Sequence, residues 1–213
     1  GHYTVDFDDF REKAKQAKLF FLCSPQNPTG RVWTEEELRR MGEICNEYGV
    51  MVVADEIHHD LIQPGYKHIV YASLGKEFAD NCVVCTSLSK TFNLAGMQFS
   101  NIIIPNKEYQ KQWTDVVSNR LSVGMCSPFG LTAIIAAYTE GEEWLDQARA
   151  YIDGNIRYIE SFVKENLPKA AVMDCQGTYL VWLDLNEYCS DPEKLEELMV
   201  QKAGIVFDEG YIF

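Results

Sequence analysis

The sequence predicts an α/β fold in which a mostly parallel sheet is flanked by helices. Short apolar runs alternate along the chain with longer amphipathic stretches, and this order is typical of parallel strands joined by helices. Polar side chains also follow three of the apolar runs directly. In open α/β sheets ligands bind beyond the carboxyl ends of the strands, so we expect the functional residues at that edge.

The first part of the chain carries the clearest strand and helix signals. The apolar runs over 19–23 and 50–54 predict buried strands. Between them, Thr34 and Glu37 form a capping box that predicts the start of a helix, and Gly49 predicts its end. The other elements expected here are a helix over 9–18 and strands over 81–85 and 99–104.

Beyond residue 124 the alternation changes to mainly helical patterns. We therefore expect a domain boundary there, with residues 1–125 in a larger domain and residues 126–213 forming inter-domain helices and part of a smaller domain. The elements expected around and after this point are helices over 107–119, 129–139, 142–166 and 192–203, and strands over 178–184 and 205–207.

The composition indicates an acidic globular protein. The chain has 213 residues, is 46% hydrophobic and carries a formal net charge of -13. A surface this acidic repels phosphate, which excludes nucleic acid as a partner, and the apolar runs are too short to cross a membrane. The seven cysteines are an odd, scattered set that favours a reducing, cytoplasmic location. Cys82 and Cys85 lack a second pair at ligand spacing, so no metal site is predicted.

Lys90 is the candidate nucleophile of the sequence. It lies in Ser87-Leu-Ser89-Lys90, just after a predicted strand, and Asp55 follows the neighbouring strand. A partly buried lysine with a lowered pKa is an amine that can form a Schiff base with a carbonyl group. From position alone, a solvated surface lysine remains the alternative.

Three motifs together resemble the pyridoxal-phosphate enzymes of the aminotransferase class I/II family, fold type I. They are Asn27-Pro-Thr-Gly30, Asp55-Glu56-Ile57 and Ser87-Leu-Ser89-Lys90. The longer segments 54–60 and 89–96 are similar to the branch that contains cystathionine β-lyase-like C–S lyases. The resemblance implies the PLP-dependent transferase-like fold. Residues 1–125 would be the second half of the large cofactor-binding domain, and residues 126–213 would include part of a smaller α+β domain.

The resemblance implies that pyridoxal 5'-phosphate is the cofactor and gives three residues a chemical role. Lys90 would hold the cofactor aldehyde as an internal aldimine and would then move the α-proton of the substrate. Asp55 would pair with the protonated pyridine nitrogen, which keeps the ring an electron sink. Asn27 would donate its side-chain amide to the phenolic oxygen of the ring.

Three further residues complete the implied cofactor site. Ser87 and Ser89 match family positions that approach the phosphate, where hydroxyl groups can donate hydrogen bonds. His58 stands where many aminotransferases carry a tyrosine that contacts the ring oxygen, and histidine is expected there in the C–S lyase branch. Gln98 stands where the aminotransferase signature has a phosphate-binding arginine, so phosphate binding would depend on hydroxyls and backbone donors.

The activity implied by the resemblance is C–S β-elimination on an amino acid, which yields a thiol, pyruvate and ammonia. A transaminase is the alternative within enzymes, because it uses the same Lys90 and Asp55. The resemblance also implies that the chain is a fragment, since the family's phosphate turn and its carboxylate-binding arginine have no counterpart here. A third interpretation is therefore an inactive folded fragment or a binding or regulatory module. The expected partners are a small amino acid substrate and a second copy in a homodimer.

Overall fold

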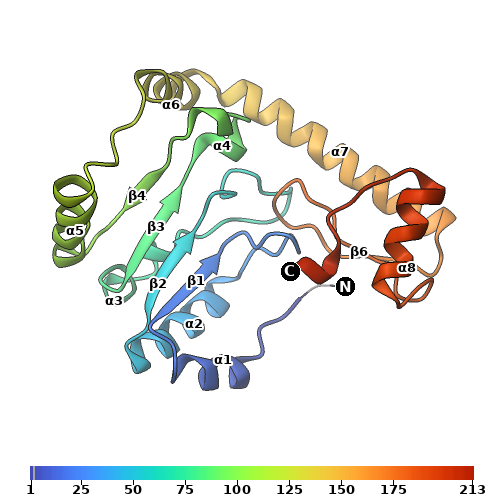
Figure 1. Ribbon diagram of the computed structural model, residues 1–213, viewed down its shortest axis with the longest axis horizontal. Helices are drawn as coiled ribbons and strands as arrows, with labels where there is room; N and C mark the ends of the chain where they lie inside the picture. The colour runs from blue at the N-terminus through green and yellow to red at the C-terminus, as the bar shows by residue number, and fades with distance from the viewer. Residues whose placement is uncertain (2) are drawn as a thin grey trace.

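The computed structural model describes residue 1 and residues 3–213, and a four-stranded sheet lies at its centre (Figure 1). The strand order is β1 (Leu19–Cys23), β2 (Met51–Asp55), β3 (Cys82–Thr86) and β4 (Asn101–Ile103). The first three strands are parallel, and β4 is antiparallel to β3. The predicted α/β class with a mostly parallel sheet is confirmed.

Helices of the first part of the chain cover one face of this sheet. They are α1 (Phe7–Ala14), α2 (Glu35–Tyr48) and α3 (Lys76–Ala79), with the short helix η1 (Tyr71–Ser73). The predicted capping box is present at the start of α2, where Thr34 accepts from the Glu37 backbone and Glu37 accepts from the Thr34 backbone. Gly49 ends α2 in the left-handed conformation, with φ 67°. The core between α2 and the strands includes Leu22, Leu38, Met41, Ile44, Val52, Ala54 and Val84.

The prediction that β1 is fully buried is wrong for one of its faces. Phe20 and Leu22 pack in the core, whereas Leu19 is 50% exposed and Phe21 is 70% exposed. Successive side chains of a strand point to opposite faces of the sheet. An entirely apolar run therefore indicates that both faces of a strand suit a buried position. It does not indicate which of the two faces other parts of the described chain cover.

The rest of the chain is mainly helical. The long helix α7 (Glu142–Asn166) runs from α6 toward the region of α8 and β6, as Figure 1 shows. The other elements are α4 (Leu88–Thr91), η2 (Ala95–Met97), α5 (Lys107–Thr114), η3 (Asp115–Arg120), α6 (Pro128–Glu140), β5 (Ala171–Val172), β6 (Leu183–Asp184), α8 (Pro192–Glu197), η4 (Leu198–Ala203) and η5 (Gly210–Ile212). The predicted division at residue 125 stays a prediction.

Two predicted strands in this second part are wrong. Of the expected strand over 178–184, only Leu183 and Asp184 pair, with β5. Thr178 adopts φ 70°, in the left-handed region, and its hydroxyl accepts from the Leu180 backbone, so the chain bends there. The segment 205–207 is apolar but has no strand partner among the described residues, and Val206 is 80% exposed.

Within the part of the chain that the structure describes, no helix combines the length and the apolar character that crossing a bilayer requires.

Candidate active site

The carboxyl ends of the three parallel strands lie level with one another. The register pairs Asp55, the last residue of β2, with Cys23 of β1 and with Cys85 of β3. The segments that follow these strand ends carry Asn27, His58 and Lys90, the last of them on helix α4. The sheet therefore brings together residues that are far apart in the sequence, as expected for this edge of a parallel sheet.

A cavity of about 810 Å³ opens at this edge. Its lining includes Asn27, His58 and Lys90, together with Tyr179 and the segment that follows it. Three of the six predicted site residues therefore share one cavity. Asp55, Ser87 and Ser89 are adjacent in sequence to this group but are not part of the described lining.

His58 is the most buried of the lining residues named here, with 2% of its surface exposed. Its Nδ1 atom is buried and has no hydrogen-bond partner in the described structure. The ring of Tyr179 packs edge-on against the imidazole, with 5.8 Å between the ring centroids. Burial lowers the pKa of His58, the charge of Lys90 lowers it further, and the charge of Asp55 opposes both. His58 is thus held neutral at pH 7, close to an amine and a carboxylate.

Lys90 lies on α4 and is partly buried. The start of this helix is held by Ser87, whose buried hydroxyl accepts from the Ser89 backbone N–H at 3.1 Å and donates to the Phe99 carbonyl at 2.6 Å. The Ser89 hydroxyl lies 2.7 Å from the Ser87 hydroxyl. Ser89 is the more exposed of the two serines, so its hydroxyl is the more accessible to a ligand.

Asp55 is exposed at the end of β2, and one of its oxygens accepts from the Ile57 backbone N–H at 3.2 Å. The next residue, Glu56, is 1% exposed and turns into the protein. Its carboxylate accepts from the Tyr71 backbone N–H at 2.8 Å and lies 2.9 Å from His68 Nε2. Glu56 thereby holds His68 and Tyr71 close to the loop that carries His58. This role could not be predicted from the sequence, although Glu56 belongs to the motif Asp55-Glu56-Ile57.

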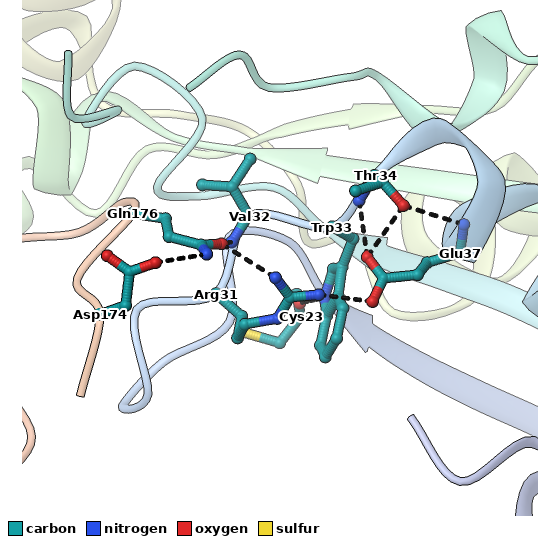
Figure 2. A network of polar contacts seen from close by, with 8 residues as sticks. All are labelled: Cys23, Arg31, Val32, Trp33, Thr34, Glu37, Asp174 and Gln176. Atoms are coloured by element: carbon teal, nitrogen blue, oxygen red, sulfur yellow. Dashed lines mark hydrogen bonds and ion pairs between the residues drawn. The ribbon is translucent and has the colours of Figure 1, made fainter. Parts of the chain in front are cut away.

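A polar network holds the Asn27 loop in place (Figure 2). Arg31, which is 6% exposed, forms an ion pair with Glu37 at 2.5 Å and donates to the Gln176 side chain at 3.1 Å. The same Gln176 oxygen accepts from the Val32 backbone, and the guanidinium of Arg31 lies over the ring of Trp33. The network therefore joins the loop after β1 to the segment before Tyr179.

Sequence reasoning missed Arg31, Gln176 and Tyr179. Arg31 and Gln176 are 145 residues apart, and no spacing pattern connects them. The local signal in the sequence was Gly30, the last residue of the Asn27 motif, which adopts the left-handed conformation in the structure. Its φ is 74°, and a Cβ there would lie 3.1 Å from Cys175 Cα.

The described residues contain no group of three or more His, Cys, Asp or Glu side chains placed to hold a metal ion. All seven cysteines are free, and Cys82 is buried whereas Cys85 is only partly so.

Comparison with known proteins agrees with this fold. The model of the family described as aminotransferase class I and II matches residues 1–213, and the chain belongs to this family. Cystathionine beta-lyase PatB from Bacillus subtilis (strain 168) is 42% identical over 212 residues, which are 99% of this chain and 54% of that protein. The chain therefore spans about half the length of the curated relatives that it matches.

Solved structures give the same result. Cystalysin from Treponema denticola, which contains a pyridoxal 5'-phosphate cofactor, superposes with a TM-score of 0.94 at 40% identity, over 99% of this chain and 54% of that chain. The PLP-bound C-S lyase from Staphylococcus hominis gives a TM-score of 0.90 at 37% identity, over 100% of this chain and 54% of that chain. The predicted family and fold type are confirmed.

Proposed function

We propose that the protein containing this chain is a pyridoxal-phosphate-dependent C–S β-lyase that acts on an amino acid. The observation that carries this proposal is the meeting of Asn27, His58 and Lys90 in one cavity beside the carboxylate of Asp55. PatB and the Staphylococcus protein support the narrower assignment, because they are described as a cystathionine beta-lyase and a C-S lyase. Cystalysin supports the cofactor.

The side chains present fit such a cofactor. Lys90 offers a primary amine and Asn27 an amide donor at the cavity. Asp55, exposed at the end of β2, offers a carboxylate for a pyridine nitrogen. His58 adds a buried Nδ1 atom that has no partner among the described residues, and a buried polar atom of this kind is costly unless a ligand or water satisfies it. Ser89 supplies a hydroxyl for the phosphate.

When bound, the cofactor supplies an electron sink for a carbanion at the substrate Cα. Lys90 Nζ would hold the cofactor in the resting protein and would take the proton from the substrate Cα, which it could then pass to the departing thiolate. Asp55 would pair with the protonated pyridine nitrogen, and this charge pair would keep the ring an effective electron sink. Asn27 and the neutral His58 would orient the ring through its oxygen.

Lys90 can be tested directly by reduction of the cofactor adduct. Pyridoxal phosphate is added to the protein, the mixture is reduced with borohydride, and the label is located by mass spectrometry of peptides. We expect one phosphopyridoxyl group on Lys90 and none in Lys90→Ala. Lys107→Ala, a change on α5, is the matched control and should label like the wild type. A label spread over surface lysines, or no label, would overturn the proposal and favour an inactive or regulatory module.

Transamination is the second candidate, because the matching family is described by that activity. Incubation of the full-length protein with cystathionine separates the two reactions. Release of a thiol and pyruvate without any 2-oxo acid supports the lyase. A requirement for a 2-oxo acid acceptor supports the transaminase.

We also propose a homodimer in the cytoplasm. Apolar side chains before and on α6 support association, because Met125 is 95% exposed and Phe129 is 79% exposed. The seven free cysteines support a reducing compartment. Light scattering of the full-length protein after size exclusion tests the dimer, and a monomer mass would contradict it.

A further inference from the structure

Lys90 lies on a helix that is too short to be stable alone. The four residues of α4 are followed by two backbone hydrogen bonds that return to it, from the Phe92 N–H to the Leu88 carbonyl at 2.9 Å and from the Leu94 N–H to the Ser89 carbonyl at 3.1 Å. Isolated helices need several turns before they persist in water. The position of Lys90 therefore depends on the contacts that hold the two ends of α4.

The Ser87 hydroxyl holds the first end, and Thr91 holds the second. Thr91 is 1% exposed, and its hydroxyl donates to Asp60 Oδ2 at 2.9 Å. This bond joins two residues 31 positions apart: Thr91 follows Lys90 directly, and Asp60 comes two residues after His58. It therefore ties the amine to the segment that supplies the carboxylate and the imidazole of the same site.

The Asp60 carboxylate is itself held in place. The same Oδ2 atom lies 3.2 Å from His59 Nε2, and His59 Nδ1 donates to the Glu56 carbonyl at 2.7 Å. Glu56 is fixed in turn by His68 and by the Tyr71 backbone. The acceptor for Thr91 is thus anchored through a chain of polar contacts rather than carried by a mobile side chain.

We propose that Asp60 is a positioning residue, which fixes α4 through Thr91 and so directs the Lys90 side chain into the cavity. The proposal rests on the proposed function of Lys90 as the cofactor-binding amine. His58 and Asp55 of the same segment would contact the cofactor, whereas Asp60 would act on Lys90 through Thr91. Hydrogen bonds to charged groups are among the stronger ones in proteins, so loss of this bond should measurably loosen a one-turn helix.

The first test uses Asp60→Ala and Thr91→Val, with Thr91→Ser as the variant that keeps the hydroxyl. Asp153→Ala is the matched control, because its side chain is 22% exposed against 25% for Asp60 and it also has a charged partner, Arg157 at 2.9 Å. The rate at which added pyridoxal phosphate forms the reducible adduct on Lys90 is measured. We expect a decrease of about tenfold or more in Asp60→Ala and Thr91→Val, and rates near wild type in Thr91→Ser and Asp153→Ala.

The second test needs no cofactor. Hydrogen exchange of the Phe92 amide reports the opening of α4, and it should quicken about tenfold in Asp60→Ala and Thr91→Val but not in Thr91→Ser. If Asp60→Ala fails to fold, Thr91→Val decides, since it removes only the hydroxyl at nearly equal volume. Wild-type exchange in a folded Thr91→Val protein would overturn the positioning role. Absence of any adduct in the wild type would instead overturn the proposed function, and the exchange result would still decide the role of Asp60.

Discussion

At the scale of single residues, two glycines share a left-handed backbone but differ in their surroundings. Gly30 has φ 74° and Gly49 has φ 67°. A Cβ added at Gly30 would lie 3.1 Å from Cys175 Cα and 3.3 Å from the Gly177 carbonyl, whereas one added at Gly49 would meet nothing within 4 Å. Gly30 therefore serves a close approach of two chain segments, and Gly49 serves only the end of a helix.

Gly30→Ala should destabilise the protein more than Gly49→Ala. Both substitutions place a side chain in the left-handed region, at a cost of about 1 kcal/mol, but only Gly30→Ala adds crowding against backbone atoms, at a further cost of about 1–3 kcal/mol. Urea denaturation measures the free energy of unfolding of each variant. Equal losses would show that the approach of residues 175–177 to Gly30 is not tight.

His58 should make stability depend on pH. Because burial and Lys90 lower its pKa in the folded state, the unfolded chain binds a proton that the folded chain resists once the pH falls below about 6.5. This contribution is absent at pH 7.5, where both states are neutral, and it grows as the pH decreases. Between pH 7.5 and 5.5 the wild type should therefore lose more stability than His58→Gln.

If the folded state did not protonate His58 at all, the wild type would lose about 1.4 kcal/mol of its free energy of unfolding at pH 5.5 through this group. The free energy of unfolding, measured in urea at both pH values for both proteins, gives the difference. An equal pH dependence in the two proteins would show that the folded state protonates His58 without resistance.

At the scale of elements, α2 combines two functions at its first turn. Glu37 caps the helix through Thr34 and also pairs with Arg31, whose side chain is 7% exposed. Glu35, in the same turn, forms an exposed pair with Arg39. The first turn thus contains one buried and one exposed ion pair on the same helix.

Three alanine substitutions in and before this turn should reduce the free energy of unfolding by different amounts. Glu37→Ala leaves the buried guanidinium without its carboxylate and should cost about 3 kcal/mol. Thr34→Ala removes only the cap and should cost about 1 kcal/mol, and Glu35→Ala should cost less than about 0.5 kcal/mol. The free energies of unfolding in urea test this order. A Glu37→Ala loss no larger than that of Thr34→Ala would show that Gln176 and Trp33 suffice to hold Arg31.

The elements that local signals define were predictable from the sequence. The capping box and Gly49 located α2 closely, and the apolar runs located β1, β2 and β3 within a residue at each end. The predicted strand over 178–184 failed because contacts distant in sequence decide its shape: the Thr178 backbone donates to Leu61, and Gln63 donates to the Thr178 carbonyl. Lys90, His58 and Asn27 were found through their motifs, whereas Tyr179 and Gln176 reach the site only through folding.

At the scale of the whole molecule, apolar side chains of the described chain remain on the surface. Phe21 on β1 and Phe129 on α6 are 70% and 79% exposed. Large exposed apolar areas mark surfaces that associate with other protein. The 213-residue chain should therefore self-associate.

Sedimentation velocity across a concentration series tests this expectation. Phe21→Ser and Phe129→Ser together should shift the distribution toward monomer. Tyr151→Ser is the control, because this ring on α7 is 73% exposed but carries a hydroxyl that stays hydrated. A monomer at every concentration for the unmodified chain would contradict the prediction.

The approach of residues 176 and 177 to Gly30 also has a dynamic consequence. Both backbone amides donate to the single Gly30 carbonyl, each at 2.9 Å. Neither amide can be released to solvent while the other contact keeps the two segments together, so both should exchange with deuterium at one common rate. That rate would report how often the Asn27 loop and the segment leading to Tyr179 separate. These two amides would therefore measure the local opening of the structure at the side of the cavity.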